Sequence, residues 1–323
     1  MESSDVAEQL LFNQSANVPD ITAVTISYLF CIFAGSLSVL IFFGNLLVIM
    51  SIVYFKQLHT PTNFLMLSLA VADLLVGLLV MPFSVVLFVS SYWRLEDLLC
   101  KVRGSLDVLL CSSSIWNVWC ISVDRYYAVC QPLRYRTKIN VRVVWIMIMV
   151  SWSAATLNGI MLSLKAPEKG QKNNKRASIE VQTQKTTVVA AVFGFGLPAV
   201  TISSIYLKIL MVAHKQARSI LNMDKSGANV SKMERKATKT LAIVVGSFLM
   251  SWTPYIFCIS FYPLSNYTIP VNVLQTFKWL GWSNSMLNPF IYAFFYSWFR
   301  SAFRMIITGK IFTDDFSNSK LFF

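Results

Sequence analysis

The fold of this chain is indicated most clearly by the stretch of residues 98–130, LLCKVRGSLDVLLCSSSIWNVWCISVDRYYAVC. Asp107 stands near its start, and the charged triplet Asp124-Arg125-Tyr126 stands near its end. At about 1.5 Å of helical rise per residue, the two aspartates lie roughly 25 Å apart, most of the thickness of a bilayer core. A charge inside such a segment costs about 3 kcal/mol to insert, so each aspartate is predicted to have a function.

The composition indicates a membrane protein. Of the 323 residues, 55% are hydrophobic and only 13% are charged, which is too much apolar surface for a soluble domain of this size to bury. The net charge of +13 comes from basic residues at the joints between apolar runs, with no continuous basic tract. We therefore expect these residues to set membrane topology and expect no nucleic-acid partner.

Seven apolar runs are each long enough to cross a bilayer as a helix. They cover residues 24–55, 63–90, 98–130, 141–164, 186–213, 236–261 and 270–294. The sequence thus predicts an all-α membrane protein, a seven-transmembrane helix bundle spanning 24–295. An extracellular segment, 1–23, would precede the bundle, and an amphipathic helix with a cytoplasmic tail, 296–323, would follow it.

The distribution of basic residues predicts the orientation. With the N-terminus outside, the joints facing the cytoplasm hold 15 Lys and Arg, against 9 in the outer joints. The sequon at Asn13 would then be extracellular and open to glycosylation. The first 23 residues show no pattern of a cleavable signal peptide. We expect a multi-pass protein of the plasma membrane with an extracellular N-terminus.

The residues after the seventh run predict a helix on the membrane surface. Phe299 and Phe303 would share one helical face, while Arg300 and Arg304 would occupy another, an arrangement that suits anionic lipid. Gly309 would end this helix. The alternative is a solvated tail with chance periodicity.

Polar residues near mid-depth predict a cluster in the bundle interior. Lipid offers no hydrogen bonds, so these groups must find one another. A carboxylate among hydroxyl and amide oxygens suits a small hard cation such as sodium, and the alternative is a network that only joins helices. The cluster comprises Asn45, Asp73, Ser114, Asn284, Ser285 and Asn288.

Prolines predict hinges in the last three runs. Pro198, Pro254 and Pro289 each remove a backbone hydrogen bond and favour a kink. Trp252 lies just before Pro254, and Phe248 lies one turn earlier on the same face. Rotation of the sixth helix would sweep both rings through the interior, although plain packing of two aromatic rings explains the spacing equally well.

Several ordered motifs together resemble the landmarks of rhodopsin-like (class A) G-protein-coupled receptors. They are Gly44-Asn45-Leu46-Leu47-Val48, Leu69-Ala70-Val71-Ala72-Asp73-Leu74, Asp124-Arg125-Tyr126, Trp152, Trp252-Thr253-Pro254 and Asn288-Pro289-Phe290-Ile291-Tyr292. In the fifth run, Pro198 and Tyr206 supply the match. The resemblance implies a receptor that signals to a heterotrimeric G protein, and no enzyme.

Two stretches narrow the resemblance to one branch of that class. Asp107 is similar to the acid that binds a ligand's ammonium in aminergic receptors. The stretch 284–299, NSMLNPFIYAFFYSWF, and the stretch 236–241, KATKTL, resemble trace amine-associated receptors. That family implies a small biogenic or trace amine as ligand, an olfactory role and a stimulatory G protein that raises cyclic AMP.

The ligand-binding set follows from Asp107 and the aromatic rings expected near it. A buried carboxylate needs a cation, and a primary ammonium supplies both charge and donors. Ring faces on the sixth and seventh helices would add cation–π contacts of roughly 0.5–2 kcal/mol each. Alternatively, a tyrosine or tryptophan donor holds Asp107 for structure alone. The expected set is Asp107, Val108, Cys111, Trp252, Tyr255, Ile256, Trp279 and Trp282.

The activation residues follow from the same resemblance. Glu234 resembles the acid that pairs with Arg125 in the resting state, and outward movement of the sixth helix would open this pair to a G protein. Ile115, Pro198 and Phe248 resemble the packing triad between the ligand and this pair. The remaining members of the set are Asp124, Tyr126, Tyr206, Asn288, Pro289 and Tyr292.

Two features depart from the family. Trp282 stands where relatives carry a tyrosine, and no cysteine in the second outer joint can pair with Cys100, so no disulfide is expected there. That joint, 165–185, holds six basic and two acidic residues and would repel cations. An aminergic-type receptor with a non-amine ligand, or with none, is therefore the alternative.

Other classes of membrane protein fit the sequence less well. A transporter or channel would show repeated halves or matched broken helices, and neither is present. An intramembrane hydrolase would need a catalytic pair or a zinc motif. The two histidines, His59 and His214, stand far apart near inner joints and form no such motif. Sodium is the one cofactor that the sequence suggests.

Overall fold

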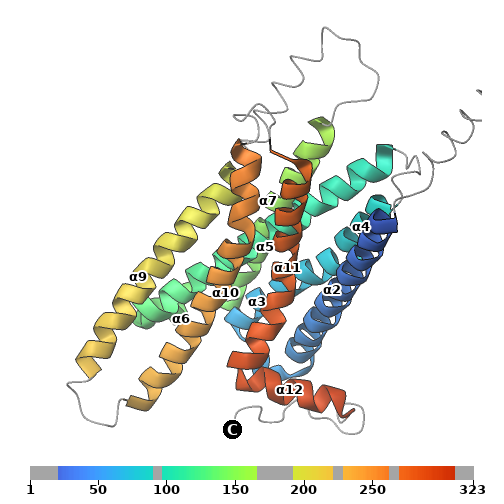
Figure 1. The fold of residues 1–323 in the computed structure, drawn as a ribbon. Coiled ribbons are helices and arrows are strands. Elements are labelled where there is room, and N and C mark those ends of the chain that lie inside the picture. The colour runs from blue at the N-terminus through green and yellow to red at the C-terminus, as the bar shows by residue number, and fades with distance from the viewer. Residues whose placement is uncertain (1–20, 90–96, 166–191, 221–227, 262–268, 310–323) are drawn as a thin grey trace, which may run out of the picture.

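The computed structural model describes residues 21–89, 97–165, 192–220, 228–261 and 269–309, and all regular structure in these ranges is helical (Figure 1). The bundle consists of α2 (Ile21–Tyr54), α3 (Pro61–Leu75), η2 (Val76–Val80), α4 (Met81–Val89), α5 (Asp97–Cys130), α7 (Val141–Lys165), η3 (Val192–Gly196), α9 (Leu197–Ile220), α10 (Ala228–Phe261) and α11 (Val271–Phe295). Three short helices complete the described chain: η1 (Lys56–Leu58), α6 (Pro132–Lys138) and α12 (Ser297–Ile307).

Six helical segments of the described chain are long and apolar enough to cross a membrane. They are Tyr28–Tyr54, Pro61–Val86, Val102–Cys130, Val141–Met161, Gly194–Val212 and Ile243–Phe261. The seventh long helix, α11, is less apolar because it carries Lys278 and the interior amides Asn284 and Asn288. Six apolar spans and a more polar seventh helix agree with the predicted all-α bundle.

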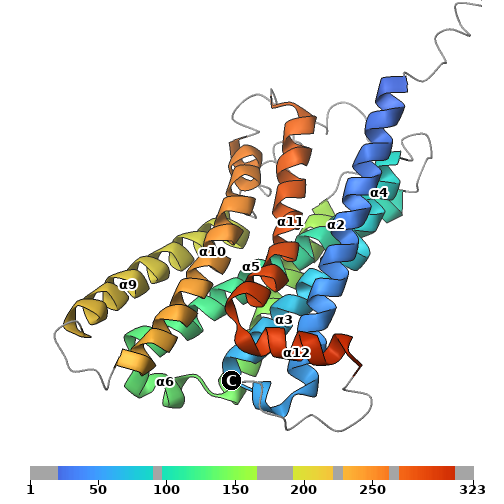
Figure 2. The same cartoon turned by 60° about the horizontal axis from the view of Figure 1, so that its bottom comes forward.

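The long helices pack around α5. This helix contacts α7, α3 and α9, and two views show it crossing behind α10 and α11 (Figures 1 and 2). The polar seventh helix, α11, contacts α10 on one side and α2 on the other. Apolar side chains such as Val150, Leu207 and Phe257 are more than half exposed, as expected where a bundle faces lipid.

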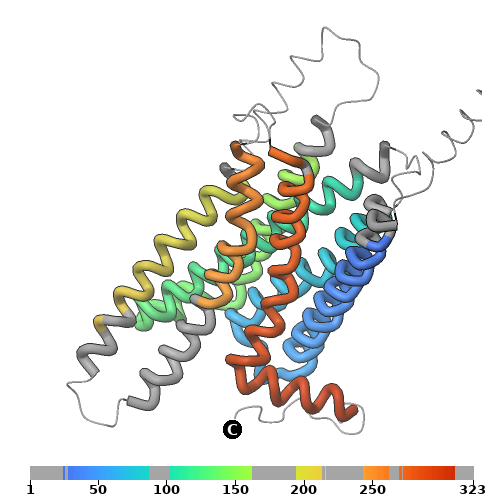
Figure 3. The backbone as a smooth tube through the Cα atoms, in the orientation of Figure 1, coloured from blue at the N-terminus to red at the C-terminus, as the bar shows by residue number. Residues whose placement is uncertain are grey.

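The predicted prolines lie within long helices or at the start of one. Pro254 lies within α10 and Pro289 within α11, and the backbone of both helices continues without a break (Figure 3). Pro198 is the second residue of α9 and directly follows η3, a turn of wider π-helix. The structure places these prolines inside or at the start of long helices, while bending and motion at them stay predictions.

Asn45 repairs the hydrogen bond that Pro289 removes. Pro289 has no N–H to donate to the carbonyl of Ser285, four residues earlier. The Asn45 side chain donates to that carbonyl instead, with an Nδ2–O distance of 3.0 Å, and also to the carbonyl of Ile41 at 2.9 Å. A Cβ added at Gly44 would lie 3.1 Å from the Pro289 ring, so glycine permits α2 to approach α11 closely.

The surface helix predicted after the bundle is α12. Figure 2 shows it crossing the foot of the bundle, and its Trp298, Phe299 and Ala302 are buried. Arg300 Nη1 donates to the last carbonyls of α11, those of Ala293 and Phe294, at 3.1 and 3.0 Å. Gly309 follows the helix end with a φ of 69°, a left-handed conformation that glycine adopts freely.

Asn45→Ala should destabilise the receptor. The buried Ser285 carbonyl would lose the side-chain donor that replaces the missing proline N–H, which costs about 1–3 kcal/mol. A loss of that size should lower the unfolding temperature of purified, detergent-solubilised receptor by several °C. Ser51→Ala is the matched control, because Ser51 is also buried in α2 but bonds only the Leu47 carbonyl of its own helix. Equal losses in the two variants would contradict the repair by Asn45.

Candidate functional site

A buried carboxylate lies between the third and seventh spans. Asp107 on α5 is 3% exposed, and its Oδ1 accepts a hydrogen bond from Trp282 Nε1 of α11 at 2.9 Å. Cys111, one turn further along α5, donates from Sγ to the same oxygen at 3.3 Å. The tryptophan donor that the sequence raised as a structural partner of Asp107 is therefore present.

The other carboxylate oxygen holds a cation that the sequence analysis did not single out. Lys278 of α11 places its Nζ against Asp107 Oδ2 in an ion pair, and the lysine side chain is 23% exposed. Lys278 stands four residues before Trp282, so both residues point from the same face of α11 toward α5. This spacing, and the position of Lys278 eight residues inside the apolar run 270–294, were the available signals.

Aromatic rings surround the paired ammonium. Lys278 Nζ lies 5.2 Å from the centre of the Trp282 ring and 5.9 Å from that of Tyr255 on α10. Arg103 approaches Trp282 as well, with its Cζ 5.5 Å from the ring centre. The structure therefore brings together four members of the predicted ligand-binding set: Asp107, Cys111, Tyr255 and Trp282.

The other members of the predicted set lie at the edges of this site. Trp279 packs edge-on against Trp282 and against Phe30 of α2, at ring distances of 4.9 and 5.0 Å. Val108 and Ile256 are half-buried. Trp252 packs edge-on against Tyr255 at 6.2 Å and is 6% exposed.

Trp252 rests against the backbone of α11. A Cβ added at Gly281 would come within 2.8 Å of the Trp252 ring, so only glycine leaves room for the ring in this position. Below it, Phe248 is fully buried and stacks on Phe195 at 6.2 Å. The other two members of the predicted packing triad, Ile115 and Pro198, are buried as well.

Asp73 is the centre of the polar cluster predicted at mid-depth. It is fully buried and accepts hydrogen bonds from Ser114 at 3.2 Å, Ser285 at 2.9 Å and Asn288 at 2.7 Å. Three helices, α3, α5 and α11, thus meet on one carboxylate. Among the described residues, no basic side chain forms an ion pair with it.

Two buried amide oxygens of α11 leave acceptors unused. Asn284 Oδ1 and Asn288 Oδ1 are buried without a hydrogen-bond donor among the described residues. Buried oxygens without donors next to an unpaired carboxylate fit a small cation. The described part of the chain holds no group of three His, Cys, Asp or Glu side chains, so transition-metal ligation finds no support there.

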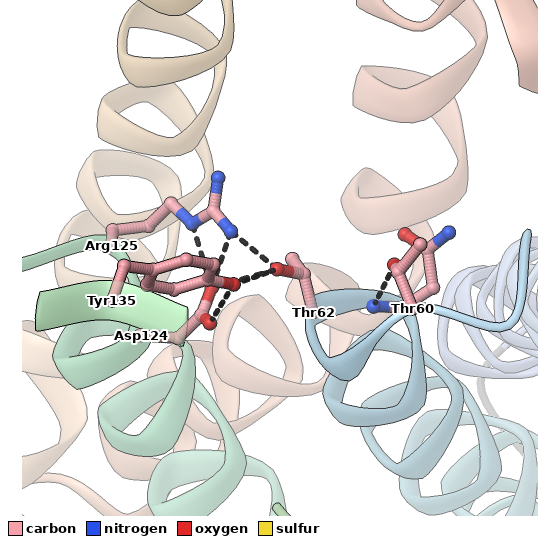
Figure 4. Close-up of polar contacts among 6 residues, drawn as sticks. Thr60, Thr62, Asp124, Arg125 and Tyr135 are labelled. Atoms are coloured by element: carbon pink, nitrogen blue, oxygen red, sulfur yellow. Dashed lines mark hydrogen bonds and ion pairs between the residues drawn. The ribbon is translucent and has the colours of Figure 1, made fainter. Parts of the chain in front are cut away.

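The opposite end of α5 carries a second ion pair (Figure 4). Arg125, whose side chain is 16% exposed, pairs with the fully buried Asp124 and also donates to the Thr62 hydroxyl. Thr62 Oγ1 and Tyr135 OH each donate to Asp124 at 2.9 Å. Burial, followed by the nearby Asp124 carboxylate, raises the pKa of Tyr135, so the phenol stays protonated and remains a donor.

The remaining activation residues are buried or half-buried where their side chains are described. Tyr206 and Tyr292 are 7% and 3% exposed, and Tyr126 receives the Lys208 ammonium over its ring at 5.4 Å. The predictions on Asn13 and on most of 165–185 fall on residues that the structure does not describe. Glu234 and Cys100 lie on α10 and α5, but their side chains are not described.

Comparison with known proteins identifies the family. Residues 44–292 match the model of the "7 transmembrane receptor (rhodopsin family)". The chain is 44% identical to trace amine-associated receptor 1 of Macaca mulatta over 86% of this chain and 87% of the relative. It is 42% identical to the Homo sapiens protein of the same name, with the same coverage. It is 40% identical to trace amine-associated receptor 4 of Mus musculus over 93% and 90%.

These matches cover the bundle and both ion pairs. They confirm the predicted fold class and the absence of enzymatic function, because the members of this family are receptors. The chain therefore belongs to the rhodopsin family of seven-transmembrane receptors, as a multi-pass membrane receptor of the trace amine-associated type.

Proposed function

We propose that this receptor binds a small biogenic or trace amine by its ammonium, with Asp107 as the anchor. The single observation that carries the proposal is that this carboxylate already holds an ammonium, that of Lys278. A site that binds one ammonium in a nearly dry, ring-lined space has the chemistry to bind another.

The surroundings of Asp107 favour the charged form of a primary amine. Trp282 fixes one carboxylate oxygen at 2.9 Å and leaves the other for a cation. The rings of Tyr255 and Trp282 face the bound ammonium and add cation–π attraction of about 0.5–2 kcal/mol each. Both contacts would transfer to a ligand ammonium in the same place.

The proposed signal runs from the amine to the Arg125 end. Trp252 lies between the amine site and Phe248, so a ligand that moves Trp252 would act on α10, which Pro254 weakens two residues later. Outward movement of α10 would open the Arg125 end to a heterotrimeric G protein. We propose a stimulatory G protein, a chemosensory role, and a plasma-membrane orientation with the N-terminus outside.

The contacts of Arg125 and Asp124 at the end of α5 form what we call the latch. A few kcal/mol could shift the equilibrium between its closed and open arrangements. Arg125 is held by Asp124 and Thr62, and Tyr135 adds a donor to the same carboxylate (Figure 4). We propose that Glu234 adds a further resting-state partner from α10. On opening, Tyr206 and Tyr292 would take over part of this network, as the resemblance implies.

We propose that Asp73 binds a sodium ion. Ser114, Ser285 and Asn288 already surround the carboxylate, and the unused oxygens of Asn284 and Asn288 supply further ligands. The ion would supply the positive charge that no described side chain provides. Because the three donors come from two helices besides α3, a bound ion would stabilise one arrangement of the bundle.

One observation favours a second candidate function. Lys278 fills the cation position of Asp107, so a simple amine must displace it before binding. The second candidate is a receptor of aminergic type whose ligand is not a simple amine, or that has no ligand. In that receptor no simple amine has to displace Lys278 from Asp107.

Asp107→Asn should strongly weaken amine-evoked cyclic AMP signalling at surface-expressed receptor. Loss of the carboxylate removes the charge pair with the ligand, which shifts half-maximal concentration by about 30-fold or more. The panel would contain 2-phenylethylamine, tyramine, isoamylamine and trimethylamine. Asp107→Glu keeps the charge and should keep part of the response. An unaltered response of Asp107→Asn would refute the amine anchor, and a wild type that is silent to the whole panel would refute a simple amine as the ligand.

Tyr135→Phe should raise basal signalling. The variant loses a donor to Asp124 at 2.9 Å, so the resting arrangement loses about 1 kcal/mol and basal cyclic AMP rises by up to about fivefold. Tyr127→Phe is the matched control, because Tyr127 lies at the same end of α5 and no hydrogen bond of its hydroxyl is seen among the described residues. Equal basal activity in the two variants would contradict the proposal that the bond from Tyr135 to Asp124 stabilises the resting state.

Sodium should stabilise the purified receptor more than choline at equal ionic strength. A ligand that binds only the folded state raises stability by RT ln(1 + [L]/Kd), so the unfolding temperature should rise with sodium concentration. Asp73→Asn removes the charge and should remove the difference between the salts. Equal unfolding temperatures of the wild type in both salts would contradict the sodium site.

A further inference from the structure

The proposed amine site already contains a cation, because Lys278 pairs with Asp107. Its ammonium pairs with Asp107 Oδ2, while Trp282 and Cys111 donate to Oδ1 at 2.9 and 3.3 Å. Both oxygens of the carboxylate are therefore engaged. A ligand that binds here through an ammonium must take the place of Lys278.

A second cation lies beside the first. Arg103 stands four residues before Asp107 on α5 and so faces the same side of that helix. Its guanidinium lies over the Trp282 ring at 5.5 Å and donates to the neutral hydroxyl of Ser84 at 2.7 and 3.2 Å. Among the described residues, no carboxylate forms an ion pair with Arg103.

The charge balance of the site disfavours a simple monoamine. Asp107 is one negative charge against the two positive charges of Lys278 and Arg103. A bound monoamine would add a third positive charge and would leave Lys278 without its carboxylate. Like charges in a largely buried space repel more strongly than in water, because solvent screens them less.

A ligand with both charges resolves this conflict. We propose that the site takes a zwitterion of amino-acid type, whose ammonium replaces Lys278 on Asp107 while its carboxylate pairs with the displaced Lys278. This inference rests on the proposed function, because it uses Asp107 as the ammonium anchor. Lys278 can make this exchange because its side chain is 23% exposed and can rotate around each of its side-chain bonds, which lets the ammonium move away from Asp107.

Arg103 strengthens the same preference. Its guanidinium is bonded to a hydroxyl and not to a carboxylate among the described residues, so it adds positive potential without a compensating charge. A ligand carboxylate near Lys278 would lie in the field of both cations. With a zwitterion bound, every charge of the site except that of Arg103 has a direct partner, and Arg103 attracts the ligand carboxylate at longer range.

The test uses matched pairs of probes that differ only by a carboxylate: phenylalanine and 2-phenylethylamine, tyrosine and tyramine, leucine and isoamylamine. Binding is measured as the rise in unfolding temperature of purified, full-length receptor, so that it does not depend on which G protein couples. The receptors are wild type, Lys278→Met and Lys278→Arg, each compared with its own unliganded unfolding temperature.

At least one amino acid should bind wild-type receptor at least about tenfold more tightly than its matched amine. Lys278→Met should reverse that order, because the ligand carboxylate loses its partner and the amine loses its competitor. Lys278→Arg, which keeps the positive charge, should retain the preference for the amino acid. This variant separates loss of charge from loss of folding.

Other outcomes distinguish failure of the zwitterion proposal from failure of the proposed function. If amines bind through Asp107 but no amino acid binds any of the three receptors, Lys278 only competes with amines, and the zwitterion fails while the amine function stands. If no probe binds wild type, Lys278→Met or Lys278→Arg, the ammonium anchor fails and the inference falls with it. If amino acids bind but evoke no cyclic AMP, the ligand class stands and the proposed stimulatory coupling fails.

Discussion

Lipid supplies neither hydrogen bonds nor counter-charges, so every polar group inside this bundle must find its partner within the chain. Three buried aspartates meet this constraint at three depths. Asp107 joins α5 to α11, Asp73 joins α3 to α5 and α11, and Asp124 joins α5 to α3 and to α6. Because α5 contributes to all three clusters, its position fixes the helices around it.

The three carboxylates differ in what they hold, and this difference separates their proposed roles. Asp107 and Asp124 each hold a basic side chain, from Lys278 and Arg125, whereas Asp73 holds only neutral donors among the described residues. A side-chain cation can be exchanged for a ligand or released by a helix movement. A carboxylate with neutral donors can take up an ion. One constraint thus underlies the proposed exchangeable ion pair at each end and the proposed ion site between them.

The sequence predicted the groups that are costly in lipid, and it failed where the answer depends on how helices face one another. Asp73, Asp107 and Arg125 stand out because an ionisable residue within an apolar run needs an explanation. The same rule applied to Lys278, which lies inside the run 270–294, but its partner Asp107 follows only from how α11 faces α5. The bond from Asn45 to the Ser285 carbonyl could not be predicted either, because the spacing of residues within one helix does not show which residue of another helix lies opposite.

The account depends most on the claim that Asp107 requires a cationic partner. The most direct measurement is a double-mutant cycle on the unfolding temperature, with wild type, Asp107→Asn, Lys278→Met and the double variant. Lys278→Met leaves a buried carboxylate unpaired, which costs about 3–5 kcal/mol, so the double variant should be clearly more stable than Lys278→Met alone. Losses that simply add would show that the two residues are not paired, and would contradict the account.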